Sequence, residues 1–195
     1  MILTASMLTS TSLLANDNIK YDWVELDLGF SSTSFSDQYS AIISSSFSLS
    51  DRFYVTMDAS RGIRDYNWRD NKSAMNEYSL SLGFHTAMGE KTDFYSELGL
   101  GRLDEENKYY SQFTNDYVYF NVKQNFAQLK LGTRTAFTEK FELITNITFK
   151  DDYLHTIDLG VKGVYKFNKK SSLTFGRDTS DNKGDVFIGW RYNWK

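Results

Sequence analysis

Hydrophobic and polar residues alternate along most of the chain from residue 21 onward. In the first such segment Val24, Leu26, Leu28 and Phe30 fall on one side, and residues with polar or small side chains fall between them. Side chains of an extended strand point alternately to its two faces, so a period of two predicts β-strands. The alternation recurs along the chain to its C-terminal segment. We predict an all-β protein with about ten strands, and eight strands as the alternative.

The connections between these strands alternate in length. Short and polar ones occupy residues 50–52, 89–92, 138–140 and 168–170, and longer ones occupy residues 65–76, 104–116 and 178–184. An antiparallel up-and-down barrel with short turns at one rim and long loops at the other has this rhythm. The segment 117–137 is long for one strand. It predicts a strand that stands well above its neighbours, with a bulge near Asn125.

Alternation alone does not say which face points outward. A soluble barrel would crowd dozens of large apolar side chains into its interior, whereas a transmembrane barrel turns them to lipid. With the apolar face outside, six acids and six bases fall in the lumen, and equal numbers predict paired charges because an unpaired buried charge is costly. These residues are Glu25, Asp27, Asp58, Glu97, Glu142 and Asp158 with Lys130, Arg134, Lys150, Lys162, Lys166 and Arg191. We predict a closed transmembrane β-barrel.

Composition narrows the class further. The 195 residues suit one domain, and the absence of Pro favours uninterrupted strands because Pro removes a ladder donor. No apolar run is long enough for a membrane-spanning helix. A net charge of −3 argues against a nucleic-acid partner, and without Cys there is neither a disulfide framework nor a thiolate metal site. We expect no cofactor.

The N-terminal stretch has the character of an export signal. Residues 1–15 contain no charge and precede the polar segment 16–22, which predicts a signal peptide ending at Ala15 and a barrel over residues 16–195. A basic start is missing, which a truncated or misassigned start would explain. A buried N-terminal strand or helix is the alternative.

The C-terminal segment carries a family resemblance. Residues 189–194 read Gly-Trp-Arg-Tyr-Asn-Trp, a Gly followed by aromatic residues at alternating positions. This resembles the terminal signature of small Gram-negative outer-membrane barrels of the OmpX-like and OmpA-barrel type. The resemblance implies export through the periplasm to the outer membrane, contact with outer-membrane lipid and lipopolysaccharide, and recognition of Gly189, Tyr192 and Trp194 by the barrel-assembly machinery. We expect a monomer. An ordinary amphipathic edge strand is the alternative for this segment.

Candidate catalytic groups are few. Asp151, Asp152 and His155 lie close together and are loosely similar to the water-activating residues of omptin-type proteases, but a second acidic pair is missing. His85 and Thr86 are adjacent on a strand and point to opposite faces, so they cannot act together as in lipid A deacylases. We interpret the first group as a solvated loop and His85 as a hydrogen-bonding lumen residue near the inner rim. No catalytic, cofactor-binding or metal residues are predicted.

One loop region is basic. Arg61, Arg64, Arg69 and Lys72 surround the first long connection, which would suit lipopolysaccharide phosphates, and a solvated loop is the alternative. The sequence therefore predicts a non-enzymatic protein with a salt-bridged, largely closed lumen that acts structurally or through its extracellular loops. A narrow passive porin-like channel is the alternative, and an outer-membrane protease or lipid A-modifying enzyme ranks third.

Overall fold

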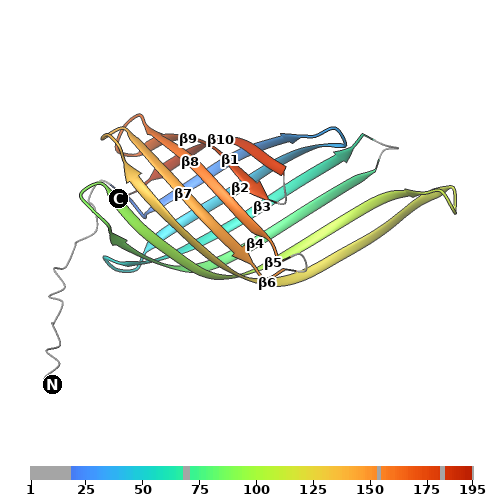
Figure 1. The fold of residues 1–195 in the computed structure, drawn as a ribbon, viewed down its shortest axis with the longest axis horizontal. Helices are drawn as coiled ribbons and strands as arrows, with labels where there is room; N and C mark the ends of the chain where they lie inside the picture. The colour runs from blue at the N-terminus through green and yellow to red at the C-terminus, as the bar shows by residue number, and fades with distance from the viewer. Residues whose placement is uncertain (1–18, 68–70, 153–154, 181–182, 195) are drawn as a thin grey trace, which may run out of the picture.

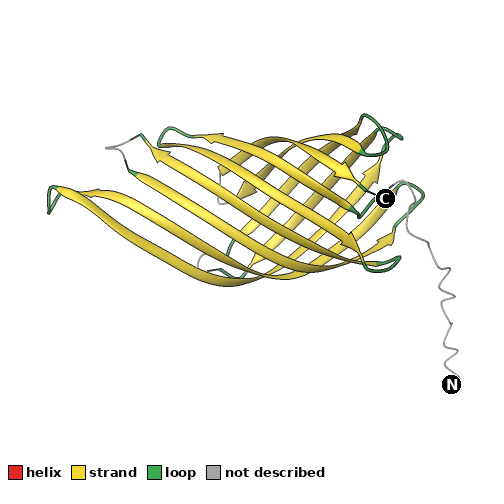
Figure 2. Cartoon of the chain, turned by 180° about the vertical axis from the view of Figure 1, so that it is seen from behind, coloured by secondary structure: helices red, strands yellow, loops and turns green. Residues whose placement is uncertain are grey.

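The computed structural model describes residues 19–67, 71–152, 155–180 and 183–194. They form a closed barrel of antiparallel strands (Figure 1, Figure 2). The strands are β1 (Trp23–Ser32), β2 (Ser36–Ser48), β3 (Phe53–Tyr66), β4 (Lys72–Ala87), β5 (Thr92–Ser111), β6 (Asp116–Ala136), β7 (Phe141–Lys150), β8 (Ile157–Lys166), β9 (Ser171–Ser180) and β10 (Lys183–Asn193). The predicted all-β barrel is confirmed, with ten strands rather than eight. Among the described residues, no helix is long and apolar enough to cross a membrane.

The sheet closes where its first and last strands meet. Strand β1 pairs with β2 on one side and with β10 on the other, from Trp23 opposite Asn193 to Phe30 opposite Val186. Each strand pairs with its sequence neighbour elsewhere. Closure leaves no free sheet edge around the ring where all ten strands are present.

The apolar face of the wall points outward. Leu98 and Leu100 are 67% and 71% exposed, whereas Glu25 on the inner face is 1% exposed. Aromatic side chains gather on the outer surface near the rim with the short turns. There Phe47 packs against Trp194 and Phe53 against Phe84, with ring centroids 5.1 and 5.4 Å apart. An apolar outer band with an aromatic girdle is typical of a lipid-facing barrel surface.

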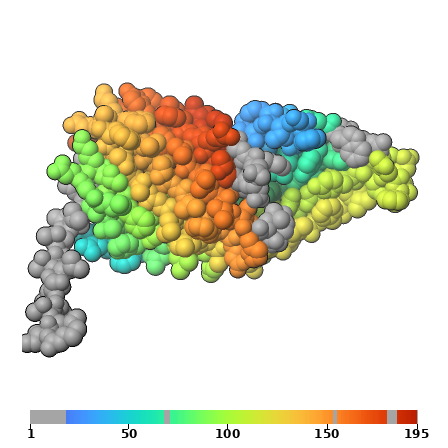
Figure 3. Space-filling view, in the orientation of Figure 1, coloured from blue at the N-terminus to red at the C-terminus, as the bar shows by residue number. Residues whose placement is uncertain are grey.

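The strands differ greatly in height. Strands β5 and β6 have 20 and 21 residues, whereas β7, β8 and β9 have 10 each. The β5–β6 hairpin therefore projects beyond strands β7–β10, as the yellow-green end of Figure 3 shows. The prediction of a tall strand is correct. The predicted bulge near Asn125 is wrong, because β5 and β6 keep one register from Thr92 opposite Thr135 to Ser111 opposite Asp116.

The long predicted loops are mostly strand. Between β5 and β6 the connection runs only from residue 112 to 115, and between β3 and β4 from 67 to 71. Polar residues occupy both faces of a strand once it leaves the membrane. The alternation then disappears from the sequence although the ladder continues.

Candidate functional site: the charged lumen

The inner half of the lumen holds a network of buried ion pairs. Glu25 on β1 accepts a hydrogen bond from Arg191 Nε at 2.6 Å, and it also accepts one from the Lys162 ammonium. Lys162 donates to Asp27 at 3.1 Å, and the Thr174 hydroxyl donates to the same carboxylate at 2.7 Å. Because Glu25 and Asp27 both have cationic donors, and Asp27 a hydroxyl donor as well, their charges are held in a narrow interior at tolerable cost.

A second group of charges lies on β5, β6, β7 and β8. Arg134 Nε donates to Glu142 at 2.6 Å, and the Lys166 ammonium lies 3.7 Å from the other oxygen of Glu142. Lys130 pairs with Glu97 at 3.1 Å, and the Tyr54 hydroxyl donates to Glu97 at 2.9 Å. The three ion pairs join neighbouring strands of the wall, and the hydrogen bond from Tyr54 on β3 to Glu97 on β5 spans the strand between them.

The segment before β1 closes the inner end. Tyr21 is buried, its ring stacks on His85 with centroids 3.9 Å apart, and the guanidinium of Arg134 lies 4.5 Å from the same ring. Arg134 also donates to the backbone oxygen of Lys20 at 2.8 Å, and Ser46 donates to that of Tyr21 at 2.6 Å. Residues 19–22 therefore form an inner plug. Apart from the polar segment 16–22, nothing in the sequence pattern pointed to it.

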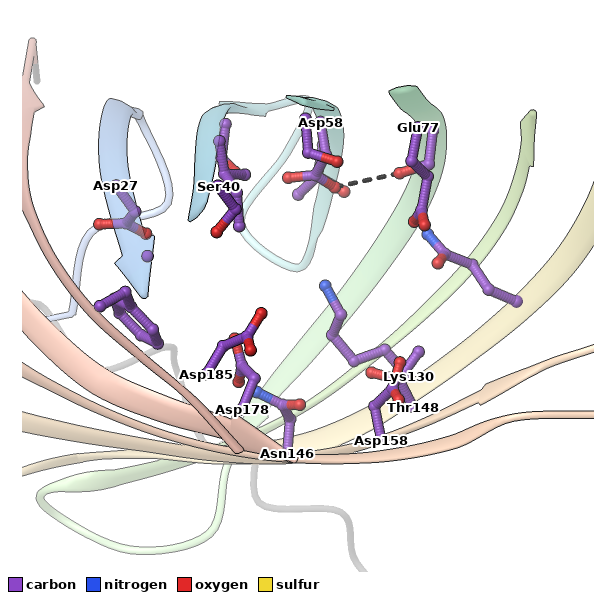
Figure 4. Close-up of a pocket in the computed structure, with 18 of the residues that line it drawn as sticks. Asp27, Ser40, Asp58, Glu77, Lys130, Asn146, Thr148, Asp158, Asp178 and Asp185 are labelled. Carbon is purple, nitrogen blue, oxygen red and sulfur yellow. Dashed lines mark hydrogen bonds between the residues drawn. The ribbon is translucent and has the colours of Figure 1, made fainter. Parts of the chain in front are cut away.

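A cavity runs along the lumen from the outer end to the inner plug, and its outer half is rich in acids. The lumen cavity has a volume of about 580 Å³, and Figure 4 shows carboxylates converging on it from β1, β3, β4, β8, β9 and β10. Lys150 pairs with Glu77 at 2.8 Å and lies 3.7 Å from Asp158, and Gln38 donates to Asp185 at 3.2 Å. The Lys130 ammonium reaches into the cavity from β6. Acidic side chains outnumber basic ones at this end, which makes the local electrostatic potential negative.

The structure places all twelve predicted charges on the lumen side. The predicted balance of acids and bases is wrong, however, because one further base and six further acids lie there. The base is Arg64, and the acids are Glu77, Asp93, Glu105, Asp152, Asp178 and Asp185. Most of them fall in or beside segments that the sequence pattern assigns to loops or turns, where polar residues on both faces hide the strand period.

The predicted basic cluster is divided by the wall. Arg64 faces the lumen, where it donates to Gln38 Oε1 at 2.6 and 2.9 Å. Lys72 pairs with Asp65 at 3.2 Å at the exposed outer surface, and Arg61 is exposed there as well. Arg69 lies outside the described residues. Contact of Arg61 and Lys72 with lipopolysaccharide stays a prediction, and Arg64 is not on the same face.

The candidate catalytic residues stand apart from one another. His85 is buried at the inner rim and stacks on Tyr21, and its Nδ1 lies 3.4 Å from Asp93 Oδ2 without a hydrogen-bond partner. His155 pairs with Asp151 at 3.1 Å in an exposed loop at the opposite rim. Among the described residues, no group of three or more His, Cys, Asp or Glu side chains could hold a metal ion.

The C-terminal segment forms the closing strand. On β10, Gly189 faces the lumen opposite Asp27, and Tyr192 faces outward opposite Val24. Trp194 follows the strand and packs on Phe47 at the outer surface. Their recognition by an assembly machinery stays a prediction.

Comparison with known proteins gives a fold and no family. No family model and no curated protein matches the chain. Among solved structures, the NanC porin matches with a TM-score of 0.50 at 10% identity, over 87% of this chain and 99% of that one. The translocator domain of autotransporter NalP from Neisseria meningitidis gives 0.49 at 8% identity, over 89% and 87%. Neisserial surface protein A gives 0.46 at 10%, over 90% and 98%.

The likeness to the NanC porin shows the fold alone, because the sequences are so different. The chain has the fold of the outer-membrane β-barrels, which confirms the predicted resemblance at that level. A closer relation to OmpX-like or OmpA-type barrels stays a prediction.

Proposed function

We propose that this protein is a monomeric barrel of the Gram-negative outer membrane that is closed at its periplasmic end and acts, without catalysis, through its extracellular end. The observation that carries the proposal is the inner plug, in which Tyr21 is held by His85, Arg134 and the Ser46 hydroxyl. Beyond it, Lys162 on β8 crosses the lumen to Glu25 and Asp27 on β1 and narrows the bore. A lumen closed at its inner end supports a structural or surface-interaction role better than transport.

The exterior supports the membrane location. The outer band is apolar, the girdle is aromatic, and both termini of the described chain lie at the rim with the short turns (Figure 1). In outer-membrane barrels short turns face the periplasm and long elements face outward. Export by residues 1–15, which lie outside the described residues, and insertion by the barrel-assembly machinery belong to the same proposal.

A narrow channel is the second candidate. The residues that line the cavity run from Gln38 and Arg64 at the outer end to Tyr21 and Tyr54 at the plug, so only the inner end separates the bore from a continuous path. The surplus of acids would make such a path selective for cations.

Single-channel conductance of the refolded protein in a planar bilayer separates the two. The parent protein should show little or no steady conductance. Changing Arg134→Ser and Lys162→Ser together should give a measurable, cation-selective current, because it removes the ring contact to Tyr21 and frees Asp27 of its ammonium. A control variant with Arg61→Ser and Lys123→Ser, at exposed positions, should show no more conductance than the parent. A parent that conducts stably, with no change in the double variant, would establish the channel instead.

A further inference from the structure

The upper part of β6 has a sheet partner on one side only. It pairs with β5 from Asp116 to Thr135, but with β7 only from Gln128 to Ala136. The amide of Asp151 donates to the backbone oxygen of Ala127 at 2.9 Å and ends the contact with the next strand. Over residues 116–126 no second strand lies beside β6 within the described part of the chain. We call this stretch the free edge.

The free edge presents a regular row of unused backbone groups. In an antiparallel sheet, alternate residues direct their N–H and C=O groups to the same side. Because Ala127 points its carbonyl toward β7, the other odd-numbered residues point to that side too. Asp116 Oδ1 accepts the N–H of Tyr117 at 2.7 Å. Within the described residues, four others have no such partner at the free edge: Tyr119, Asn121, Lys123 and Asn125.

This edge has little of the protection that exposed edges usually carry. Natural sheets block such edges with Pro, bulges, inward charges or very short strands. The chain contains no Pro, the β5–β6 register has no bulge, and Lys123 is the one basic residue between 116 and 126. The segment 117–120 reads Tyr-Val-Tyr-Phe, which favours extended backbone. The free edge therefore has the properties of a template for strand addition.

A second copy in the same membrane does not fit. Two such copies are related by an axis along the membrane normal, so their β6 strands run in the same direction. An antiparallel ladder that continues the β5–β6 sheet needs opposite directions. The occupant must come from outside the bilayer.

The surroundings define the chemistry of the occupant. A strand added beside β6 would lie above the β7–β8 loop, with alternate side chains on the lumen side. Near the tip of the hairpin these would meet Val118, Phe120 and Val122, and Phe120 already stacks on Tyr109 at 5.5 Å. Near the base they would face the outer end of the lumen cavity, whose lining there has more acids than bases: Asp152, Asp158, Asp178 and Asp185 with Lys150. Apolar side chains suit the first region and cationic ones the second.

We infer that the free edge of β6 binds an extended peptide segment by strand addition, antiparallel to β6, with basic residues at the end nearest the lumen and apolar residues toward the tip. Main-chain hydrogen bonds would supply affinity, and the alternating side chains would supply specificity. The inference rests on the proposed function, since the free edge meets such a partner only if this rim faces the outside.

The test uses the refolded full chain in detergent and a labelled peptide of the sequence Lys-Thr-Lys-Glu-Val-Thr-Val-Thr-Val. Its Lys and Val side chains would face the lumen side. Fluorescence anisotropy should show saturable binding. Asn121→Pro with Lys123→Pro should weaken it at least tenfold, because Pro removes the two donors at the free edge while the bonds of the even-numbered residues to β5 remain. The matched variant Asn121→Ala with Lys123→Ala keeps both amides and should bind like the parent.

Further controls distinguish binding through main-chain hydrogen bonds from binding through electrostatic attraction. A peptide N-methylated on alternate residues along its β6 side should lose binding, and exchanging both Lys for Glu should weaken it. Equal binding by the Pro and Ala variants, or by the methylated peptide, would overturn the inference in favour of capture in the acidic cavity. If the parent protein self-associates and the Pro variant does not, the occupant of the free edge is a second copy of the chain and not a peptide. Failure to bind leaves the conductance test untouched, so the two proposals fail separately.

Discussion

At the scale of single residues, the narrow lumen depends on glycines that lie beneath aromatic rings. A Cβ on Gly83 would come within 2.2 Å of the Tyr54 ring, and one on Gly132 within 2.6 Å of the Tyr95 ring. The Tyr54 ring therefore lies directly against the backbone of Gly83, and its hydroxyl donates to Glu97. Because Gly83 and Gly132 have no side chain, the rings of Tyr54 and Tyr95 can occupy the space beside them.

Replacing Gly83→Ala should therefore destabilise the barrel by about 1–3 kcal/mol, the usual cost of overpacking. The new methyl group would push Tyr54 away from Glu97. The matched variant Gly89→Ala, at a turn where no atom lies within 4 Å of the added carbon, should change little. Urea unfolding of the refolded protein, followed by Trp fluorescence, measures both. Equal stability of the two variants would show that Tyr54 can move at no cost.

At the scale of the strand, much could be predicted from alternation inside the membrane and little outside it. Leu80 and Leu82 alternate with Ser79 and Ser81, and the contrast identifies both faces of β4. Farther along, polar residues fill both faces around Glu77 and Glu105, so the upper parts of β4 and β5 could not be separated from loops.

Partners across the lumen were also beyond sequence reasoning. Lys162 and Glu25 are 137 positions apart and meet because of the stagger with which the barrel closes. Neither charge carries a local signal of the other. The twelve charges could be placed on the inner face, whereas their pairing across the lumen depends on three-dimensional closure.

The two faces of the barrel wall should respond differently to the same side chain, introduced on the neighbouring strands β3 and β4. Leu82→Arg would put a charge on the lipid face and cost roughly 2–4 kcal/mol near the midplane. Ser60→Arg would place the same side chain in the acid-rich cavity, where it should be tolerated. Folding yield into lipid vesicles, read from protease protection, compares them. If Leu82→Arg folds as readily as Ser60→Arg, the outward face of β4 does not meet lipid.

At the scale of the whole molecule, closure depends on β10. Deleting residues 190–195 would remove four pairs with β1, including Arg191 opposite Glu25 and Tyr192 opposite Val24. The truncated chain should stay in the periplasm and be degraded. Removing Lys195 alone keeps all four pairs and serves as the control. Cell fractionation with immunoblotting measures both chains, and normal outer-membrane levels of the truncation would contradict the assembly role of this segment.

The inner plug also has a consequence for the order of folding. Nine of the ten strand pairings join sequence neighbours and can form early, because local loops close cheaply. Tyr21 needs β4 and β6 around it, and the bond between Glu25 and Arg191 spans 166 positions. The backbone oxygen of Asp22 in the plug also accepts the N–H of Trp194 at 3.3 Å, so the plug is complete only when the two ends of the chain have met. We therefore expect the seal to form last, with the inner end of the inserting barrel open until then.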